Sequence, residues 1–173
     1  TDLELEPDAP HAADFCGSCT RCIDRCPTKA IVEPRVVDAR RCLSYLTIEN
    51  RGAIPREIRP LLGNGVFGCD LCQEACPWNR FAKAAPEREF HARSGHEAPL
   101  LVELLGLSRE EFDRRFEGSP VRRAGYAGFL RNVAVALGNS GDPSVVPALA
   151  RALEGGEPLV RAHAAWALGR LGA

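Results

Sequence analysis

Eight cysteines, all between positions 16 and 76, offer the clearest chemistry in this sequence. Seven of them form two motifs, Cys16-x2-Cys19-x2-Cys22-x3-Cys26-Pro27 and Cys69-x2-Cys72-x3-Cys76-Pro77. Thiolates at these spacings are typical of [4Fe–4S] clusters, because the short loops wrap backbone around a cubane and point N–H groups at its sulfides. The cysteines therefore predict iron–sulfur electron transfer.

The second motif lacks a leading cysteine, since Val66 stands three residues before Cys69. In the bacterial ferredoxin motif, three cysteines hold one cluster and the fourth ligates a second cluster. If the two motifs exchange their last cysteines in this way, and the isolated Cys42 supplies the missing ligand, the eight cysteines form two sites of four ligands each. The predicted ligands are Cys16, Cys19, Cys22 and Cys76 for cluster 1, and Cys26, Cys42, Cys69 and Cys72 for cluster 2. Clusters whose motifs exchange ligands must lie close together, which suits electron transfer.

Two other uses of the cysteines stay open. An even number of cysteines is compatible with a disulfide framework, although no secretory signal accompanies it. Paired zinc sites also use C-x2-C pairs, but they rarely combine three cysteines at these spacings with a following Cys-Pro. The histidines show no ligand spacing, and we expect a packing or surface role for His163 in particular; they are His11, His91, His96 and His163.

The elements around the cysteines predict a mainly α-helical protein of two parts. Residues 16–80 are rich in Gly, Pro and Cys, and predict a small α+β ferredoxin-like module whose clusters replace a large core. Residues 1–15 are expected to be an N-terminal connecting segment, and residues 81–98 are expected to be a linker. Residues 99–173 are expected to form a short HEAT-like helical repeat.

Helix signals support the second part. Ser108 and Glu111 form a capping box, which predicts a helix running to about Phe116. The triplet Ala136-Leu137-Gly138 recurs 31 residues later as Ala167-Leu168-Gly169, and Asp142-Pro143 is a typical helix start. We therefore expect helices over residues 127–138, 143–154 and 158–170, in the manner of a HEAT repeat.

Composition excludes several classes of protein. The 173 residues are 45% hydrophobic, which excludes a disordered chain. No apolar run approaches the roughly 20 residues of a membrane span, and residues 1–15 are acidic rather than signal-like, so we expect a soluble protein with no membrane partner. The sequence contains no Met, and we expect it to begin inside a longer protein. With a net charge of −1, any nucleic acid would have to bind a local patch.

The whole chain resembles the C-terminal half of epoxyqueuosine reductase. The segment around Cys42 (RCLSYLTIE) is the most specific part, because generic ferredoxins lack it. The resemblance is carried by Thr1–Asp8, Cys16–Pro27, Arg41–Glu49, Gly68–Gln73, Cys76–Asn79 and Phe129–Asn139.

The resemblance implies an oxidoreductase of tRNA modification. In the family, two [4Fe–4S] clusters reduce cobalamin, which removes the epoxide oxygen of epoxyqueuosine in the tRNA anticodon and gives queuosine. Cobalamin and the catalytic acid belong to an N-terminal domain that this chain lacks, so no catalytic residue is expected here. The family places the segment after Cys42 near the corrin or the tRNA, and we expect Ser44 and Asp70 to be cobalamin-side contacts. A helix cap for Ser44 and a turn residue for Asp70 are the alternatives.

Local positive charge offers a place for the tRNA anticodon stem-loop. Residues 35–59 carry six Arg against three acidic residues, and residues 114–131 carry five Arg against one Glu. Such arginines would bind phosphates and position the RNA without reading its sequence. The residues predicted to contact tRNA are Arg51, Arg122, Arg123 and Arg131. A solvated charged face in an Arg-rich protein is the alternative.

Three rival functions remain at this point: a stand-alone two-cluster electron carrier, a HEAT scaffold with a structural metal module, and another cobalamin–iron–sulfur reductase such as a reductive dehalogenase. The Cys42 segment and the helical repeat favour the epoxyqueuosine reductase reading. It predicts an external electron donor, a monomer, and the bacterial cytoplasm, because iron–sulfur clusters with exposed edges need a reducing compartment.

Overall fold

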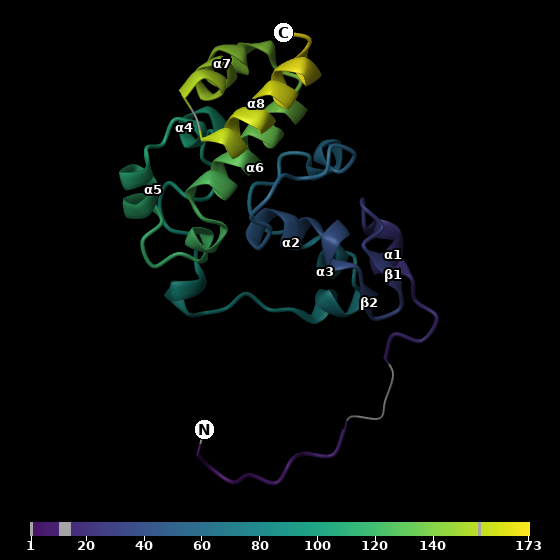
Figure 1. Cartoon of the computed structure of the whole chain (residues 1–173). Helices are drawn as coiled ribbons and strands as arrows, with labels where there is room; N and C mark the ends of the chain where they lie inside the picture. Colours follow the sequence, from purple (N-terminus) through teal and green to yellow (C-terminus); the bar gives the residue numbers. More distant parts are fainter. Residues whose placement is uncertain (1, 11–14, 156) are drawn as a thin grey trace.

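The computed structural model describes residues 2–10, 15–155 and 157–173, and is mainly helical with one small sheet (Figure 1). The cysteine-containing part has α1 Arg21–Arg25, β1 Ile31–Glu33, β2 Val36–Val37, α2 Leu43–Ile48 and α3 Leu71–Glu74. The second part has α4 Leu101–Leu105, α5 Arg109–Arg115, α6 Tyr126–Asn139, α7 Val146–Gly155 and α8 Pro158–Leu171. This confirms the predicted fold class. Within the described residues, no helix is long and apolar enough to cross a membrane.

The two cysteine motifs have similar backbones, and α1 and α3 lie against each other. Helix α1 ends immediately before Cys26 and α3 ends two residues before Cys76, and both cysteines are extended. The prolines that follow impose this conformation, because their rings disfavour helical geometry at the preceding residue. Only the first motif is followed by a hairpin, in which β1 and β2 pair antiparallel. The described part of the α+β module thus has three short α-helices, α1, α2 and α3, and the β1–β2 hairpin.

The predicted helix starts are confirmed. The Ser108 hydroxyl accepts from the Glu111 N–H at 3.2 Å, and the Glu111 carboxylate accepts from the Ser108 N–H at 2.7 Å, so α5 begins with a complete capping box. The three predicted repeat helices correspond to α6, α7 and α8. One detail differs: Asp142 caps a 3₁₀ turn, Pro143–Val145, that leads into α7.

Helix α6 lies in the centre of the second part and packs closely on α8. A Cβ atom built on Gly138 would lie 2.7 Å from the Cβ of Ala167, so only glycine permits this approach. The surrounding core is apolar and includes Phe112, Phe129, Val133, Leu149, Val160 and Ala164.

The chain between the two cysteine motifs also packs on α6. Leu43, Leu46 and Ile54 share a core with Val135 of α6, and Trp166 of α8 packs against it. The side chain of Asn139 on α6 donates to the carbonyls of Arg59 and Gly63. The core around Leu46 and Val135 therefore includes residues from both sides of the predicted linker, and the boundaries at residues 80 and 98 stay a prediction.

Candidate iron–sulfur centre and anion site

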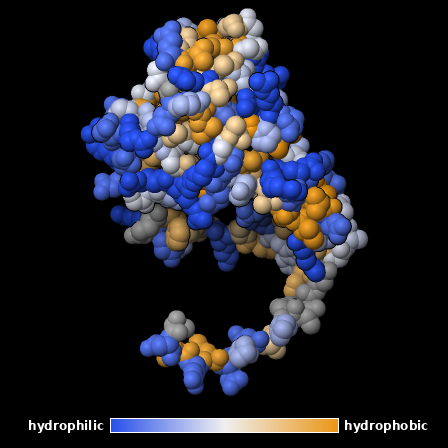
Figure 2. Space-filling view, in the orientation of Figure 1, coloured by the Kyte–Doolittle hydropathy of each residue, from blue (hydrophilic) through white to orange (hydrophobic). Residues whose placement is uncertain are grey.

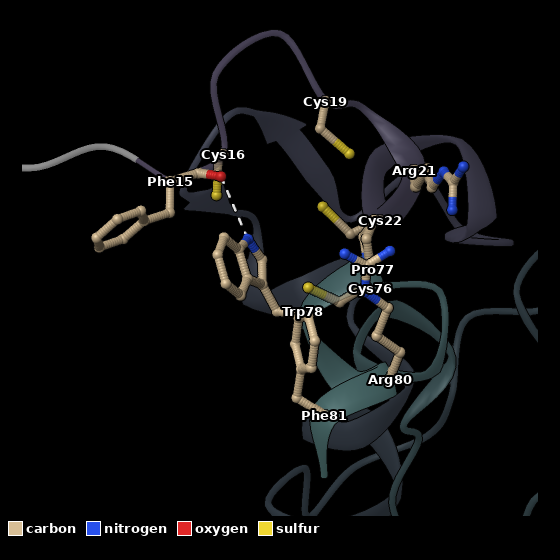
Figure 3. A pocket seen from close by; sticks show the side chains of 10 residues that line it. All are labelled: Phe15, Cys16, Cys19, Arg21, Cys22, Cys76, Pro77, Trp78, Arg80 and Phe81. Atoms are coloured by element: carbon tan, nitrogen blue, oxygen red, sulfur yellow. Dashed lines mark hydrogen bonds between the residues drawn. The ribbon is translucent and has the colours of Figure 1, made fainter.

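One cavity gathers four cysteines from the two motifs. The cavity has a volume of about 260 Å³ and is lined by Cys16, Cys19, Cys22 and Cys76, with Trp78 and Phe81 beside them (Figure 3). These are the four residues that the sequence analysis assigns to cluster 1. Because α1 and α3 are neighbours, the last cysteine of the second motif reaches the first three cysteines of the other.

Local backbone explains how the first two cysteines turn toward the cavity. The Cys19 N–H donates to the Cys16 carbonyl at 3.0 Å, which closes a tight turn. Gly17 in this turn has a φ of 51°, in the left-handed region that glycine adopts without steric cost. The indole Nε1 of Trp78 donates to the Phe15 carbonyl at 3.2 Å and so ties the second motif to the start of the first.

Three of the remaining cysteines, Cys42, Cys69 and Cys72, lie near the N-terminal ends of α2 and α3. Burial raises the pKa of the Cys72 thiol, and the nearby Cys69 and Cys42 thiols raise it further. These three residues are therefore close enough to interact electrostatically. Their like-charge repulsion is what a bound cluster, with its iron atoms between the thiolates, would relieve.

Cys26 has a different environment. The Ala30 N–H donates to the Cys26 sulfur at 3.2 Å, and the Thr28 hydroxyl lies 3.6 Å from it. Burial acts to raise the pKa of Cys26, but hydrogen bonds from Thr28 and from backbone N–H groups outweigh it and hold the pKa below its usual value. A stabilised thiolate suits a metal ligand. The place of Cys26 in cluster 2 stays a prediction.

The described cysteines form no disulfide. In the part of the chain that the structure describes, no three side chains of His, Cys, Asp or Glu converge on a single metal ion. A cubane does not require such convergence, because each thiolate binds a different iron of the cluster. His163 is fully buried in the helical part, as its predicted packing role requires, whereas His11 lies outside the described residues.

A second cavity, of about 370 Å³, gathers arginines at the N-terminal end of α6. It is lined by three of the four arginines predicted to contact tRNA, and by one that the sequence analysis missed: Arg51, Arg122, Arg123 and Arg109. Arg123 pairs with Glu49 at 2.6 Å and Arg122 with Asp113 at 3.1 Å, while Arg51 donates to the Arg123 carbonyl at 2.7 Å. Residues distant in sequence thus form one cationic surface.

The prediction that Arg131 contacts tRNA is wrong. Its side chain is fully buried, and its guanidinium donates to the carbonyls of Leu46, Asn50 and Gly52 at 2.6–2.9 Å. It also donates to the Asn132 side chain. All of this guanidinium's bonding is internal, so Arg131 holds the loop that carries Arg51 and does not face a phosphate.

Asp70 and Ser44, the two residues predicted to contact cobalamin, lie in different surroundings. Asp70 is exposed beside Cys69, and both line a cavity of about 320 Å³. The Asp70 carboxylate accepts from the Gln73 side chain at 2.9 Å. Ser44 is half-buried in the first turn of α2 and does not line that cavity. The structure therefore does not bring these two side chains to one cavity.

Comparison with known proteins agrees with this architecture. Residues 15–79 match the family described as "4Fe-4S double cluster binding domain", and residues 126–173 match the family described as "HEAT repeats". The chain is thus a double-cluster iron–sulfur module joined to a HEAT repeat.

Similarity extends over the whole chain to one enzyme. The chain is 50% identical to epoxyqueuosine reductase of Xanthomonas campestris, over 99% of the chain and 48% of the relative. It is 53% identical to epoxyqueuosine reductase of Pseudomonas aeruginosa, over 99% of the chain and 48% of the relative. The chain is therefore a homologue of epoxyqueuosine reductase, and it spans about half the length of these relatives.

A solved structure shows the same fold. The crystal structure of epoxyqueuosine reductase with an epoxyqueuosine-modified tRNA-Tyr stem loop superposes with a TM-score of 0.89 at 38% identity. The match covers 98% of this chain and 45% of that one.

Proposed function

We propose that this chain is the iron–sulfur and tRNA-docking half of an epoxyqueuosine reductase, which reduces epoxyqueuosine to queuosine in tRNA. The convergence of Cys16, Cys19, Cys22 and Cys76 from two motifs on one cavity is the observation that carries this proposal. Similarity to epoxyqueuosine reductases over 99% of the chain supports this reaction. An enzyme of tRNA modification belongs in the bacterial cytoplasm, and we expect a monomer there.

The eight thiols fit two [4Fe–4S] clusters. In this proposal, Cys16, Cys19, Cys22 and Cys76 hold cluster 1, and Cys26, Cys42, Cys69 and Cys72 hold cluster 2. The clusters would supply one-electron transfer when bound. The chain's residues fix the thiolates by the two Cys-Pro corners, and N–H groups such as that of Ala30 stabilise the negative sulfur.

Cobalamin would be bound mainly by the part of the protein outside this chain, which would also hold the catalytic acid. Asp70 is the better supported of the two cobalamin-side contacts, because it lines a cavity next to a predicted ligand of cluster 2. Ser44 would reach the cofactor only from the exposed side of α2. No proton transfer to substrate is assigned to a residue of this chain.

The arginine-lined cavity is the proposed docking site for tRNA phosphates. Arg51, Arg122 and Arg123 line it together with Arg109, and the uncapped N–H groups at the start of α6 add positive potential. The ion pairs of Arg122 and Arg123 lie at the surface, where such pairs contribute little stability, so phosphates can compete for them. A solved relative with a tRNA stem loop supports an RNA partner.

Binding of a tRNA-Tyr anticodon stem-loop at several salt concentrations tests this site. Arg122→Ala/Arg123→Ala should weaken binding and reduce the magnitude of the salt slope by about two, since each phosphate contact contributes about 0.9. Arg161→Ala/Arg170→Ala, on exposed positions of α8, is the matched control. Unchanged affinity and slope in the first variant would exclude these arginines.

Metal analysis tests the electron-transfer role. Anaerobically purified chain should hold about eight iron and eight sulfide, and dithionite reduction should give the EPR signal of two interacting [4Fe–4S] clusters. About two zinc per chain without sulfide, repeated after iron–sulfide reconstitution, would instead indicate structural sites and refute the function.

A further inference from the structure

The rim of the cysteine cavity has the features of a protein-docking surface, and we propose that an acidic one-electron carrier protein binds there. This surface, the cluster 1 rim, consists of Phe15, Arg21, Trp78, Arg80 and Phe81. The inference rests on the proposed function, because it takes Cys16, Cys19, Cys22 and Cys76 as the ligands of cluster 1. It adds the place where electrons enter and the chemistry of the donor.

The cavity cysteines are the more accessible of the two groups. Cys16 and Cys19 are exposed, whereas Cys26, Cys42, Cys69 and Cys72 are all half-buried. A cluster in this cavity would have an edge toward solvent in this chain. An external carrier must bring its own redox group close to that edge, so the first cluster is the point of entry.

Three aromatic side chains stand around the cavity and remain largely in solvent. Phe15, Trp78 and Phe81 are 62%, 53% and 60% exposed. Trp78 packs against both phenylalanines, with ring centroids 5.6 and 5.9 Å apart, and its indole N–H is bound to the Phe15 carbonyl. The close-up shows the Trp78 ring between Phe15 and Phe81, at the side of the cavity (Figure 3). Grouped exposed aromatics of this kind characterise the centres of protein interfaces.

The apolar face also continues beyond the cavity. In the space-filling view, hydrophobic residues gather over the region of α1, β1 and β2 (Figure 2). Val32, Val36 and Val37 of the hairpin are about half exposed. The module thus exposes the hairpin valines as well as the aromatics of the rim, which points to a protein partner and not to a small reductant.

The charge of the rim selects the partner. Arg21 and Arg80 line the cavity, and no Asp or Glu is among the described residues that line it. Neither guanidinium is in an ion pair with another described residue. The Arg80 guanidinium lies over the Phe81 ring at 4.6 Å, which holds it at the rim. Arginines beside exposed aromatics favour an acidic surface and accelerate its encounter with the rim at low salt.

The electron balance is simple. The reduced carrier loses one electron, and the oxidised cluster gains it. No bond is formed or broken and no proton moves, so the surface needs only to align two redox groups. Flavodoxin, an acidic carrier with an exposed flavin edge, is a suitable probe.

The test follows the reduction of the reconstituted 173-residue chain by photoreduced flavodoxin in a stopped-flow spectrometer. Arg21→Glu/Arg80→Glu should slow the second-order reaction by about tenfold or more at low salt, and the difference should shrink as salt is added. Trp78→Ala should slow the reaction at every salt concentration, because it removes contact area. Arg161→Glu/Arg170→Glu carries the same change of charge on α8 and should have little effect.

Several results would overturn the proposal. Equal rates for the rim variant and the α8 control would show that the rim does not receive the carrier. The same comparison is repeated in a longer protein that contains this chain. Equal reduction rates of the rim variant and the α8 control in that protein would overturn the proposal, because another part of the protein would then cover the rim. Iron content and the extent of dithionite reduction establish that each variant holds its clusters. If the unaltered chain gives no reduced-cluster EPR signal with dithionite, the proposed function itself fails, and this inference with it.

Discussion

Thr47 and Asn132 should hold two predicted ligands of cluster 2, Cys42 and Cys69, at a fixed separation. The Thr47 hydroxyl accepts from the Gly68 N–H at 3.0 Å and donates to the Leu43 carbonyl at 2.8 Å. Leu43 follows Cys42 and Gly68 precedes Cys69, so one buried hydroxyl joins the two ligand segments. Asn132 of α6 reinforces it by donating to the carbonyls of Thr47 and Val66, both at 2.8 Å.

Replacing Thr47 with valine keeps the shape of the side chain and removes this junction. The Gly68 N–H then loses its acceptor in a half-buried place, which costs about 1–3 kcal/mol. If cluster 2 is lost through opening of the segment before Cys69, its loss to an iron chelator should accelerate by about 5- to 150-fold, the factor that corresponds to this energy. Thr47→Ser keeps the hydroxyl and should behave like the unaltered chain.

The assay is anaerobic iron release to a chelator, with EPR spectra of dithionite-reduced samples taken at intervals. Complete loss of the interaction signal by the time half of the iron has gone would identify one cluster leaving first, because each cluster holds half of the iron. The reasoning fails if Thr47→Val releases iron at the unaltered rate, or if both clusters leave in step. It also fails if Thr47→Ser is as labile as Thr47→Val, because the hydroxyl would then not be the cause.

Three further variants test the packing that holds this arrangement. Gly138→Ala places a methyl group 2.7 Å from the Cβ of Ala167 and should lower the free energy of unfolding in urea by about 1–3 kcal/mol. Gly169→Ala, with open space around it, should be neutral or stabilising by up to about 1 kcal/mol. Equal effects of the two variants would contradict the close contact of α6 and α8. Burial lowers the pKa of His163 from 6.5 to about 4, so the unfolded chain takes up a proton below pH 6.5 that the folded chain refuses until about pH 4. Stability should therefore fall by up to about 3 kcal/mol between these pH values, and urea midpoints of His163→Gln should show less of this fall. Arg131→Met leaves three backbone carbonyls without their charged donor, and it should lower the free energy of unfolding by about 3 kcal/mol or more, since each buried group left unsatisfied costs about 1–3 kcal/mol. A loss no greater than that of the exposed-site control Arg161→Met would refute its buried role.

Local patterns were enough to predict the cysteine cavity and the helix starts. The spacing around Cys16 and the missing ligand before Cys69 required an exchange between motifs, and the structure brings Cys76 to the first three cysteines. The capping box at Ser108 was equally local, because both of its hydrogen bonds join residues three apart. Chemistry that depends on near neighbours in sequence can be predicted without knowing the fold.

The arginines show where sequence reasoning ends. Arg131 belongs to a strongly positive segment and was predicted to be at the surface. Its burial depends on carbonyl partners 79 to 85 residues away, whose positions no local pattern reveals. Arg109 was missed for the converse reason, since it lies outside both arginine-rich segments and reaches the cavity only because α5 packs beside the start of α6.

A single turn of α6 connects the two sites. Arg131 holds the carbonyls on both sides of Arg51, which lines the proposed phosphate site, and the adjacent Asn132 holds the segment before Cys69, a predicted ligand of cluster 2. Both side chains are fully buried, and they also bind each other. The helical repeat is therefore part of the scaffold of the metal module, because the same helix that begins at the arginine cavity sets the position of the second cysteine motif. The two parts of the chain match two different family models, but both pack on α6 through these buried side chains.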